Sequence, residues 1–367
     1  MTDDTTRRSR PGAEPLPEGR PGDWHAIHIY YAANPQPLLV QCVRPLVEEL
    51  NSAGLLAGYF FINYWVEGPH VRLRLKPVTA AATEEVCRRA EAAVSGFLRR
   101  RPALYKIDDD RSRDLHNSLV RMEMSPQEAG GYLDEDGRMK YRGNNTFSYE
   151  PYAPEYGKYG GTEGVALAEW HFQRSSDLVI DLLRTKNMHL RTFRLGTSAQ
   201  LMMVMSACFL PTTGDLAQFL DTYHAFWHRY VNRADGIGVA DYGRDYDSMA
   251  EKLTRRFAHV RQVVGDGDLT RLPGYLSGWA AHCRQLRDRV CRLAVDGELV
   301  FGTAEAAGEA AGEARITDPE AALIRLLTPY LHMTNNRLHV SVVDEAYLSY
   351  LLGRTLRDHT RSGVGVS

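Results

Sequence analysis

One short segment of the chain carries a row of positively charged side chains on a single face. In GPHVRLRLK, residues 68–76, the alternation typical of a β-strand places three apolar side chains on one side: Val71, Leu73 and Leu75. The opposite side then carries four basic residues: His70, Arg72, Arg74 and Lys76. The neighbouring apolar segment, GYFFINYW, indicates that both faces of this strand are covered. A buried guanidinium pairs best with a carboxylate, so the row is expected to meet an anionic group.

Two further segments combine residue types that could act on a substrate. PEYGKYGG, residues 154–161, is a glycine-rich bend that carries Lys158 and Tyr159 and opens a helix. LHMTNNRLHVS, residues 331–341, places His332 among apolar residues near a predicted helix end. A histidine near its ordinary pKa is a suitable proton carrier. Taken alone, the three segments also fit an exposed sheet face, a plain turn and a structural histidine.

The elements that must position these residues begin with a β-α-β-β-α order. The pattern predicts strands over 24–31, 58–65 and 70–76. It predicts helices over 34–51, kinked at Pro45, and over 79–101, capped by Thr79. The helices are expected on one face of the sheet. After a polar segment, the sequence predicts helices over 163–185, 189–208, 214–232, 244–263 and 274–295. The predicted fold class is α+β, with a mixed or antiparallel sheet, packed helices and a helix-rich C-terminal half.

The chain is expected to form a single domain over 23–360, preceded by a disordered tail over 1–22. The polar, glycine-rich segment 103–162 is too long to be an ordinary loop and indicates a binding loop or flap. Residues 302–318, GTAEAAGEAAGEARITD, have the composition of a flexible linker. A closing section follows over 319–357.

The composition excludes several classes of partner. Among 367 residues, 44 are basic and 46 acidic, which gives no electrostatic reason to expect nucleic acid or an anionic membrane. The longest apolar run, Leu201 to Leu210, is too short to span a bilayer. Five cysteines without a CxxC pair favour reduced thiols in the cytoplasm. His224 and His228 could be two ligands of a zinc ion, but no third ligand is evident in the sequence. No metal and no cofactor are therefore expected.

In their order along the chain, the three segments resemble a known family. It is the C-terminal glutamate-elimination domain of class I lanthipeptide dehydratases, also called the thiopeptide-type bacteriocin biosynthesis domain. The family's His-x-Arg-x-Arg strand corresponds to residues 70–74, and its Pro-Glu-x-x-Arg-Tyr-Gly-Gly segment to PEYGKYGG. Its His-Met-x-x-Asn-Arg-Leu segment corresponds to residues 332–338. The resemblance spans about 24–358.

The resemblance implies an activity, its partners and its site residues. In the family, a glutamyl-tRNA-dependent domain or protein esterifies Ser or Thr of a ribosomal precursor peptide. The elimination domain then expels glutamate and leaves dehydroalanine or dehydrobutyrine. By motif, Arg72 and Arg74 would stabilise negative charge, Lys158 would be the third cation and His332 the acid or base. The implied substrate-binding residues are His70, Tyr159, Asn336 and Arg337. The implied enzyme works in the cytoplasm without contacting nucleic acid or membrane, and a homodimer is compatible with it.

Two departures from the family pattern keep other functions open. Lys158 replaces an arginine and loses its bidentate fork, and the segment 103–150 is longer than usual. The chain length favours a stand-alone protein, and stand-alone relatives include the pyridine synthases, which join two dehydroalanines in a formal [4+2] cycloaddition and release the leader peptide. Those relatives lack the arginines and the histidine, so Arg72, Arg74 and His332 favour elimination. A non-catalytic subunit that binds the precursor at an exposed strand edge is the third alternative.

Overall fold

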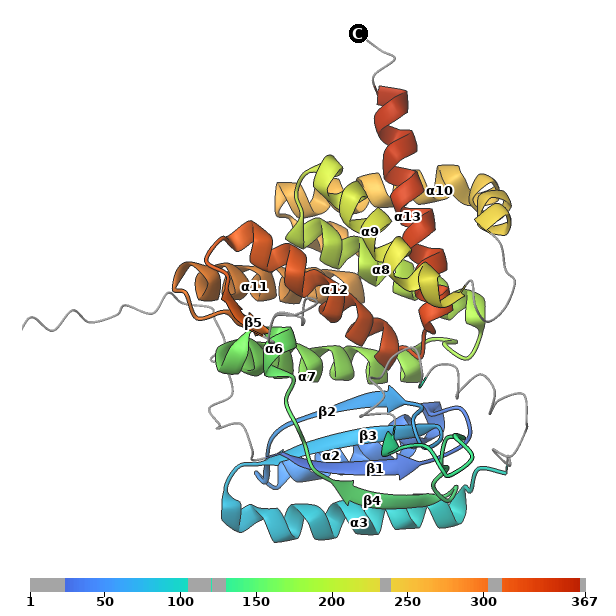
Figure 1. Cartoon of the computed structure of the whole chain (residues 1–367), viewed down its shortest axis with the longest axis vertical. Coiled ribbons are helices and arrows are strands. Elements are labelled where there is room, and N and C mark those ends of the chain that lie inside the picture. Colours follow the sequence, from blue (N-terminus) through green and yellow to red (C-terminus); the bar gives the residue numbers. More distant parts are fainter. Residues whose placement is uncertain (1–23, 105–119, 121–129, 232–238, 303–311, 364–367) are drawn as a thin grey trace, which may run out of the picture.

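The computed structural model describes residues 24–104, 120, 130–231, 239–302 and 312–363. The chain begins with an antiparallel sheet in the order β2-β3-β1-β4 (Figure 1). Its strands are β1 (His25–Tyr30), β2 (Leu56–Tyr64), β3 (His70–Pro77) and β4 (Thr146–Glu150). A helix-rich C-terminal half follows, which confirms the predicted α+β class. The tail 1–22 lies outside the described residues.

The predicted helix over 34–51 is divided in the structure. It consists of α1 (Gln36–Leu38), a π-helical turn (Leu39–Val43) and α2 (Arg44–Ser52). Pro45 lies in the first turn of α2, where a missing backbone N–H costs little free energy. The π-helical turn before α2 accommodates the break in the helical hydrogen bonds. The predicted cap at Thr79 was wrong, because its side chain makes no capping bond and a 3₁₀ turn (Ala80–Ala82) precedes α3 (Thr83–Arg100).

Five C-terminal helices lie close to their predicted positions: α7 (Gly161–Thr185), α8 (Arg191–Phe209), α9 (Thr213–Val231), α10 (Val239–Asp266) and α11 (Gly274–Val295). The closing section, for which the sequence predicted no helix bounds, forms α12 (Pro319–Arg337) and α13 (Val342–Gly363). A short helix, α6 (Tyr156–Tyr159), precedes α7. Gly160 joins these two helices with a φ of 91°, a left-handed conformation that favours glycine.

Helices cover both faces of the sheet, so the expectation of helices on one face was wrong. Helices α2 and α3 lie against one face, while α7 lies over the other (Figure 1). Helix α12 also contacts β2. The apolar face of β3 is fully buried at Leu73 and Leu75, yet Arg74 on the opposite face is only 7% exposed. The basic row is therefore enclosed rather than solvated.

The described ends of the predicted linker over 302–318 include regular structure. Strand β5 (Val300–Gly302) pairs with β6 (Glu313–Arg315) in a small antiparallel sheet, and residues 303–311 lie outside the described part. Backbone hydrogen bonds hold β6 although its side chains are exposed. In the segment 103–162, β4 completes the edge of the main sheet beside β1.

A continuous hydrophobic cluster joins the sheet to the helices. It includes Ile27 of β1, Phe60 of β2, Trp279 of α11 and Leu352 of α13. The five cysteines carry free thiols. In the part of the chain that the structure describes, no helix is both long enough and apolar enough to cross a bilayer.

Candidate functional site

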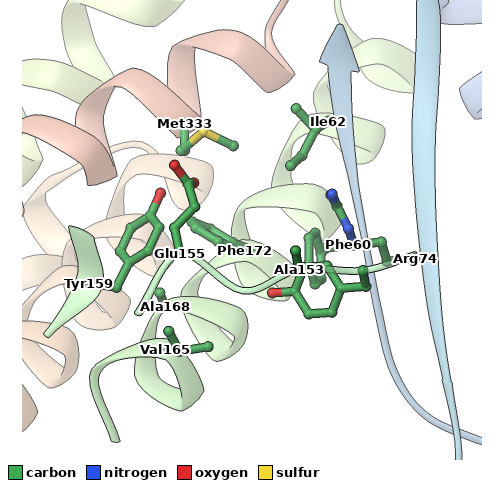
Figure 2. A pocket seen from close by; sticks show the side chains of 11 residues that line it. Phe60, Ile62, Arg74, Ala153, Glu155, Tyr159, Val165, Ala168, Phe172 and Met333 are labelled. Carbon is green, nitrogen blue, oxygen red and sulfur yellow. The ribbon is translucent and has the colours of Figure 1, made fainter. Parts of the chain in front are cut away.

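A small cavity lies between the sheet and the helices α7 and α12. Its volume is about 50 Å³. Figure 2 shows side chains from the sheet, the segment after β4, α7 and α12 around it. The polar residues of its lining are Arg74, Tyr152, Glu155 and Tyr159. A space of this size holds a carboxylate group or a few water molecules.

Arg74 lines this cavity without a partner for much of its guanidinium. Its Nε and Nη1 atoms are buried and have no hydrogen-bond partner among the described residues. The Cζ atom lies 4.7 Å from the ring centre of Tyr152 and 5.2 Å from that of Phe60. Burial lowers the pKa of Arg74 to about 10, so the side chain is still charged at neutral pH.

Arg337 is a second buried guanidinium beside the cavity. Its Nε donates to Ser176 Oγ at 3.1 Å and its Nη1 to the Met333 carbonyl at 2.7 Å, while Nη2 has no partner. Its Cζ lies 4.6 Å from the ring centre of Phe172, which lines the cavity. Burial lowers the pKa of Arg337 to about 9, which leaves it charged at neutral pH. Within the described residues no carboxylate forms an ion pair with either arginine, an arrangement that favours an anionic ligand.

Two tyrosines complete the polar lining. The Tyr159 hydroxyl is buried without a partner, and burial raises its pKa well above the ordinary value, so it can act as a neutral donor. Tyr152 instead donates to Glu169 Oε1 at 2.8 Å. Burial also raises the pKa of Glu169. Tyr152 is therefore fixed against α7 while its ring supports Arg74.

Arg72 and His70 continue the basic row along β3 outside the cavity lining. The Arg72 Cζ atom lies 3.5 Å from the ring centre of Tyr64, and its Nε donates to His70 Nε2 at 3.1 Å. His70 Nδ1 donates to the Gly68 carbonyl at 2.8 Å, which fixes the tautomer. Burial lowers the pKa of His70 to about 4 and that of His28, stacked on it at 5.1 Å, to about 3. Both rings are therefore neutral at pH 7, and His70 orients Arg72.

Lys158 lies at the edge of the cavity, not in its lining. Its side chain is 41% exposed, and its Nζ forms an ion pair with Glu155 Oε1 at 3.1 Å. Glu155 itself lines the cavity. Lys158 is therefore connected to the cavity only by its ion pair with Glu155.

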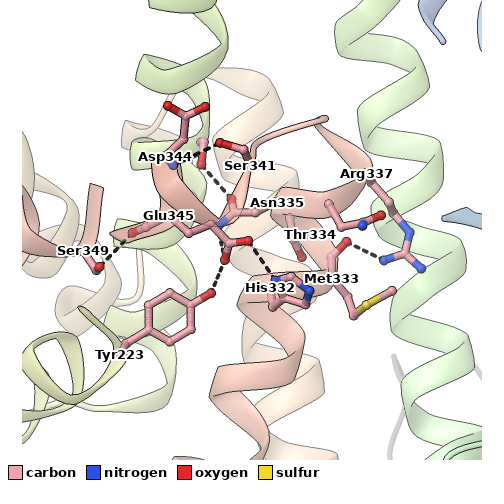
Figure 3. Close-up of polar contacts among 12 residues, drawn as sticks. Tyr223, His332, Met333, Thr334, Asn335, Arg337, Ser341, Asp344, Glu345 and Ser349 are labelled. Atoms are coloured by element: carbon pink, nitrogen blue, oxygen red, sulfur yellow. Dashed lines mark hydrogen bonds and ion pairs between the residues drawn. The ribbon is translucent and has the colours of Figure 1, made fainter. Parts of the chain in front are cut away.

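His332 belongs to a polar cluster between α12, α13 and α9 (Figure 3). Its Nδ1 lies 2.8 Å from Oε1 of Glu345, a fully buried residue, and its ring stacks on Trp227 with 4.6 Å between ring centres. Glu345 Oε2 also accepts from the Tyr223 hydroxyl and from Asn335 Nδ2. A carboxylate only accepts, so Nδ1 of His332 carries a proton and donates it to Glu345.

His332 does not line the cavity, whereas the next residue, Met333, does. Successive side chains on a helix point about 100° apart, so α12 carries one residue into the cavity and the other into the polar cluster. Of the predicted site residues, Arg74 and Tyr159 line one cavity, and Arg337, which was also predicted, lies beside it. Joint action of His332 with Arg72, Arg74 and Lys158 stays a prediction.

The sequence profile of the family described as "Lantibiotic biosynthesis dehydratase C-term" matches residues 24–356. The protein belongs to this family. No curated protein matches the sequence.

Three solved structures share the fold of this lantibiotic dehydratase C-terminal protein. The pyridine synthase TbtD from thiomuracin biosynthesis is 21% identical, with a TM-score of 0.70, over 92% of this chain and 98% of that one. TsrL is 19% identical, with a TM-score of 0.61, over 93% and 96% of the two chains. The tRNA-dependent lantibiotic dehydratase MibB from Microbispora sp. 107891 is 16% identical, with a TM-score of 0.52, over 96% of this chain and 29% of that one.

Asn336, predicted by the family motif to bind substrate, joins α12 to β2 in the structure. Its side chain accepts from the Asn63 backbone N–H at 2.9 Å and donates to the Asn63 carbonyl at 2.8 Å. The Asn63 side chain returns a bond to the Asn336 carbonyl at 2.7 Å. These bonds satisfy outward-facing backbone groups of β2 and fix the end of α12 beside the cavity.

Sequence reasoning missed several residues that shape this family member's site. Glu345, Tyr223 and Asn335 orient His332, and Tyr152 supports Arg74. Glu345 was detectable only as an acidic residue among apolar ones early in a helix, a pattern that also fits an ordinary first-turn acid. Its burial depends on α9 and α12, which no local pattern reveals.

Proposed function

We propose that this protein eliminates glutamate from glutamylated Ser or Thr side chains of a ribosomal precursor peptide. The products are dehydroalanine and dehydrobutyrine residues. The observation that supports this most is the pair of buried arginines, Arg74 and Arg337, with unpaired donors beside a cavity of about 50 Å³. The glutamyl ester carries a carboxylate that such a cavity can hold, and its departure releases another.

The reaction needs a base and charge stabilisation, but no redox step. The base takes the α-proton of the esterified residue, and the electron pair of that C–H bond is left on Cα as an enolate. The pair forms the Cα=Cβ bond as the Cβ–O bond breaks, and glutamate leaves as a carboxylate with the electrons of that bond. Arg74 would hold the glutamyl carboxylate, and Arg72, oriented by His70, would stabilise developing negative charge.

His332 is the base in this proposal. Its Nε2 accepts the proton, and Glu345, bound to Nδ1, stabilises the imidazolium that forms. The Trp227 ring stacked on the imidazole restricts its rotation. In this proposal the protein works in the cytoplasm with a glutamyl-tRNA-dependent partner that forms the ester.

A pyridine-forming [4+2] cyclase is the second candidate. It is supported by the likeness to the pyridine synthase TbtD over 98% of that chain's length. Arg74, which lines the cavity, favours elimination over cyclisation, because two dehydroalanines carry no carboxylate to bind.

A binding subunit that adds a peptide strand to the sheet is less well supported. On β2, the backbone N–H groups of Phe61 and Asn63 are already bonded to Ser176 and Asn336.

The decisive experiment gives the purified protein a precursor peptide bearing glutamyl esters, without metal, nucleotide or tRNA. Elimination predicts free glutamate and one dehydrated residue for each ester lost, measured by mass spectrometry. A cyclase would leave the ester untouched and convert a dehydrated peptide with loss of its leader. An ester that survives while the peptide is bound contradicts the proposal.

The edge of the cavity supplies a separate prediction. Lys158→Ala is expected to raise KM for the ester about fivefold, because Glu155 would then repel the substrate carboxylate. Lys158→Arg retains the charge and should stay active. Adding Glu155→Gln to Lys158→Ala should restore KM, which steady-state glutamate release measures. If Lys158→Ala behaves as the wild type, the bend at 154–161 is merely structural.

A further inference from the structure

A recess lies between α7 and α11, formed by residues that do not line the Arg74 cavity. Its volume is about 560 Å³, which is enough for a large side chain or a small molecule. Its lining includes the aromatic rings of Tyr275 and Trp279 together with His282. Trp279 is 3% exposed and its indole N–H donates to the Leu201 carbonyl at 3.1 Å, so this ring is fixed. The recess therefore has a rigid aromatic wall.

Two glycines leave open space along α11. A Cβ atom at Gly274 or at Gly278 would meet no other heavy atom within 4 Å. Residues 274, 278 and 282 are four apart, so they share one face of the helix. Helical side chains lean toward the N-terminus, so His282 leans over the space beside Gly278. A flat ring can lie against the backbone there with its edge at the imidazole.

A chain of hydrogen bonds behind the recess fixes the tautomers of two histidines. Thr334 Oγ1 donates its single proton to the Tyr330 carbonyl at 2.8 Å, so it can only accept from His171 Nε2, 3.4 Å away. Burial holds the pKa of His171 well below its ordinary value, so its ring is neutral and its Nδ1 carries no proton. His282 Nε2 lies 2.9 Å from this Nδ1 and is therefore the donor.

The same chain leaves His282 with a hydrogen-bond acceptor. Burial lowers the pKa of His282 to about 3, so its ring is neutral, and with the proton on Nε2 its Nδ1 carries a lone pair. Nδ1 forms no hydrogen bond with any described residue and is not sealed from solvent. Because His282 lines the recess, the recess has one fixed acceptor.

The charges in the lining favour a neutral ring over an ion. Arg174 and Lys186 would repel a cation, and Asp181 would repel an anion. Cations attract the face of an aromatic ring, as Lys186 already does with Tyr275, whose ring centre lies 5.9 Å from Nζ. Indole is the best partner for a cation among the aromatic side chains, and its N–H only donates. An indole therefore matches both the cations and the fixed acceptor.

We propose that the recess binds the indole side chain of a tryptophan in a peptide segment. The ring would lie over Gly278 beside Trp279, and its N–H would donate to His282 Nδ1. A peptide fits better than free indole, because the exposed carboxylate of Asp181 in the lining can accept from a backbone N–H. This inference does not rest on the elimination chemistry.

A pair of ligands tests the hydrogen bond. Fluorine NMR measures the binding of a fluorinated N-acetyltryptophanamide to the purified protein, with its indole N-methyl derivative as the matched ligand. Loss of the N–H should weaken binding to the wild type about tenfold, because the acceptor on His282 is left unpaired. In His282→Phe, which keeps a ring and removes the acceptor, the two ligands should bind equally.

Gly278→Leu tests the position of the ring. The new side chain fits open space and occupies the recess, and leucine favours a helix over glycine. The variant should therefore fold, while its affinity for the amide falls about tenfold or more. Gly196→Leu on α8 is the matched control, because a Cβ atom there also meets nothing within 4 Å and Gly196 lies outside the recess lining. Its affinity should stay within about twofold of the wild type.

The outcomes separate this recess from the elimination site. Circular dichroism checks that the variants are folded, and Gly278→Leu should release glutamate from a short glutamylated peptide without tryptophan as the wild type does. Equal affinity of the wild type for the amide and its N-methyl derivative would overturn the proposal. Unchanged affinity in Gly278→Leu, or an equal loss in Gly196→Leu, would do the same. Tighter binding of fluorinated indole than of the amide would also overturn it, because the recess would then suit a free small molecule.

Discussion

Arg74→Met is expected to reduce glutamate elimination about 10²- to 10³-fold while leaving the fold as stable as the wild type or more stable. The loss of rate follows from removing a charged donor that faces the cavity without a protein partner. The retained stability of Arg74→Met follows from the same lack of a protein partner for the guanidinium. A buried charge without an ion pair costs free energy, and methionine fills a similar volume with no charge to desolvate.

Two measurements on one variant test this prediction. Mass spectrometry should show that glutamyl esters accumulate on the peptide, and urea denaturation should show an unchanged or higher free energy of unfolding. Arg337→Met is the matched control, because Arg337 also donates to Ser176 and to the Met333 carbonyl. It should lose about 1 to 3 kcal/mol of stability.

The opposite result in both measurements would show that Arg74 has a structural role only. Full elimination by Arg74→Met, together with a lower free energy of unfolding, would mean that its guanidinium supports the packing of Tyr152 and Phe60. The cavity would then need another explanation than anion binding.

Glu345→Gln is expected to reduce elimination about 10²-fold with little change in shape. If the new amide N–H₂ faces His332, Nδ1 must accept and the proton moves to Nε2, which can then no longer act as a base. If the amide faces the other way, it opposes the N–H₂ group of Asn335, which lies 3.2 Å from Oε2. Either orientation disturbs the network around the imidazole.

A control variant distinguishes the carboxylate of Glu345 from the hydrogen bonds around it. Tyr223→Phe removes one donor to Glu345 and keeps the carboxylate, so it should alter the elimination rate less than Glu345→Gln does. An unchanged elimination rate in both Glu345→Gln and His332→Ala would remove this cluster from the reaction.

The sequence alone determined the features that depend on neighbouring residues. The alternation in residues 70–76 separated the apolar and basic faces of β3, because side chains alternate along every strand. Apolar periodicity, together with proline and glycine positions, placed the helices α7 to α11 within a few residues of their bounds, except for the start of α10, but gave no bounds for α12 and α13. Three motifs in order were enough to predict the family.

Only the tertiary structure decided which charges share a space. Arg74 and Arg337 lie on different elements, yet both approach Phe60, while Lys158 turns to the surface and pairs with Glu155. Such proximity depends on how α7 and α12 pack on β2, and no local period encodes that packing. The same holds for Glu345, whose hydrogen-bond partners come from α9 and α12. Strand β6 is held by backbone hydrogen bonds, which almost any residue can form, so its side chains do not predict it.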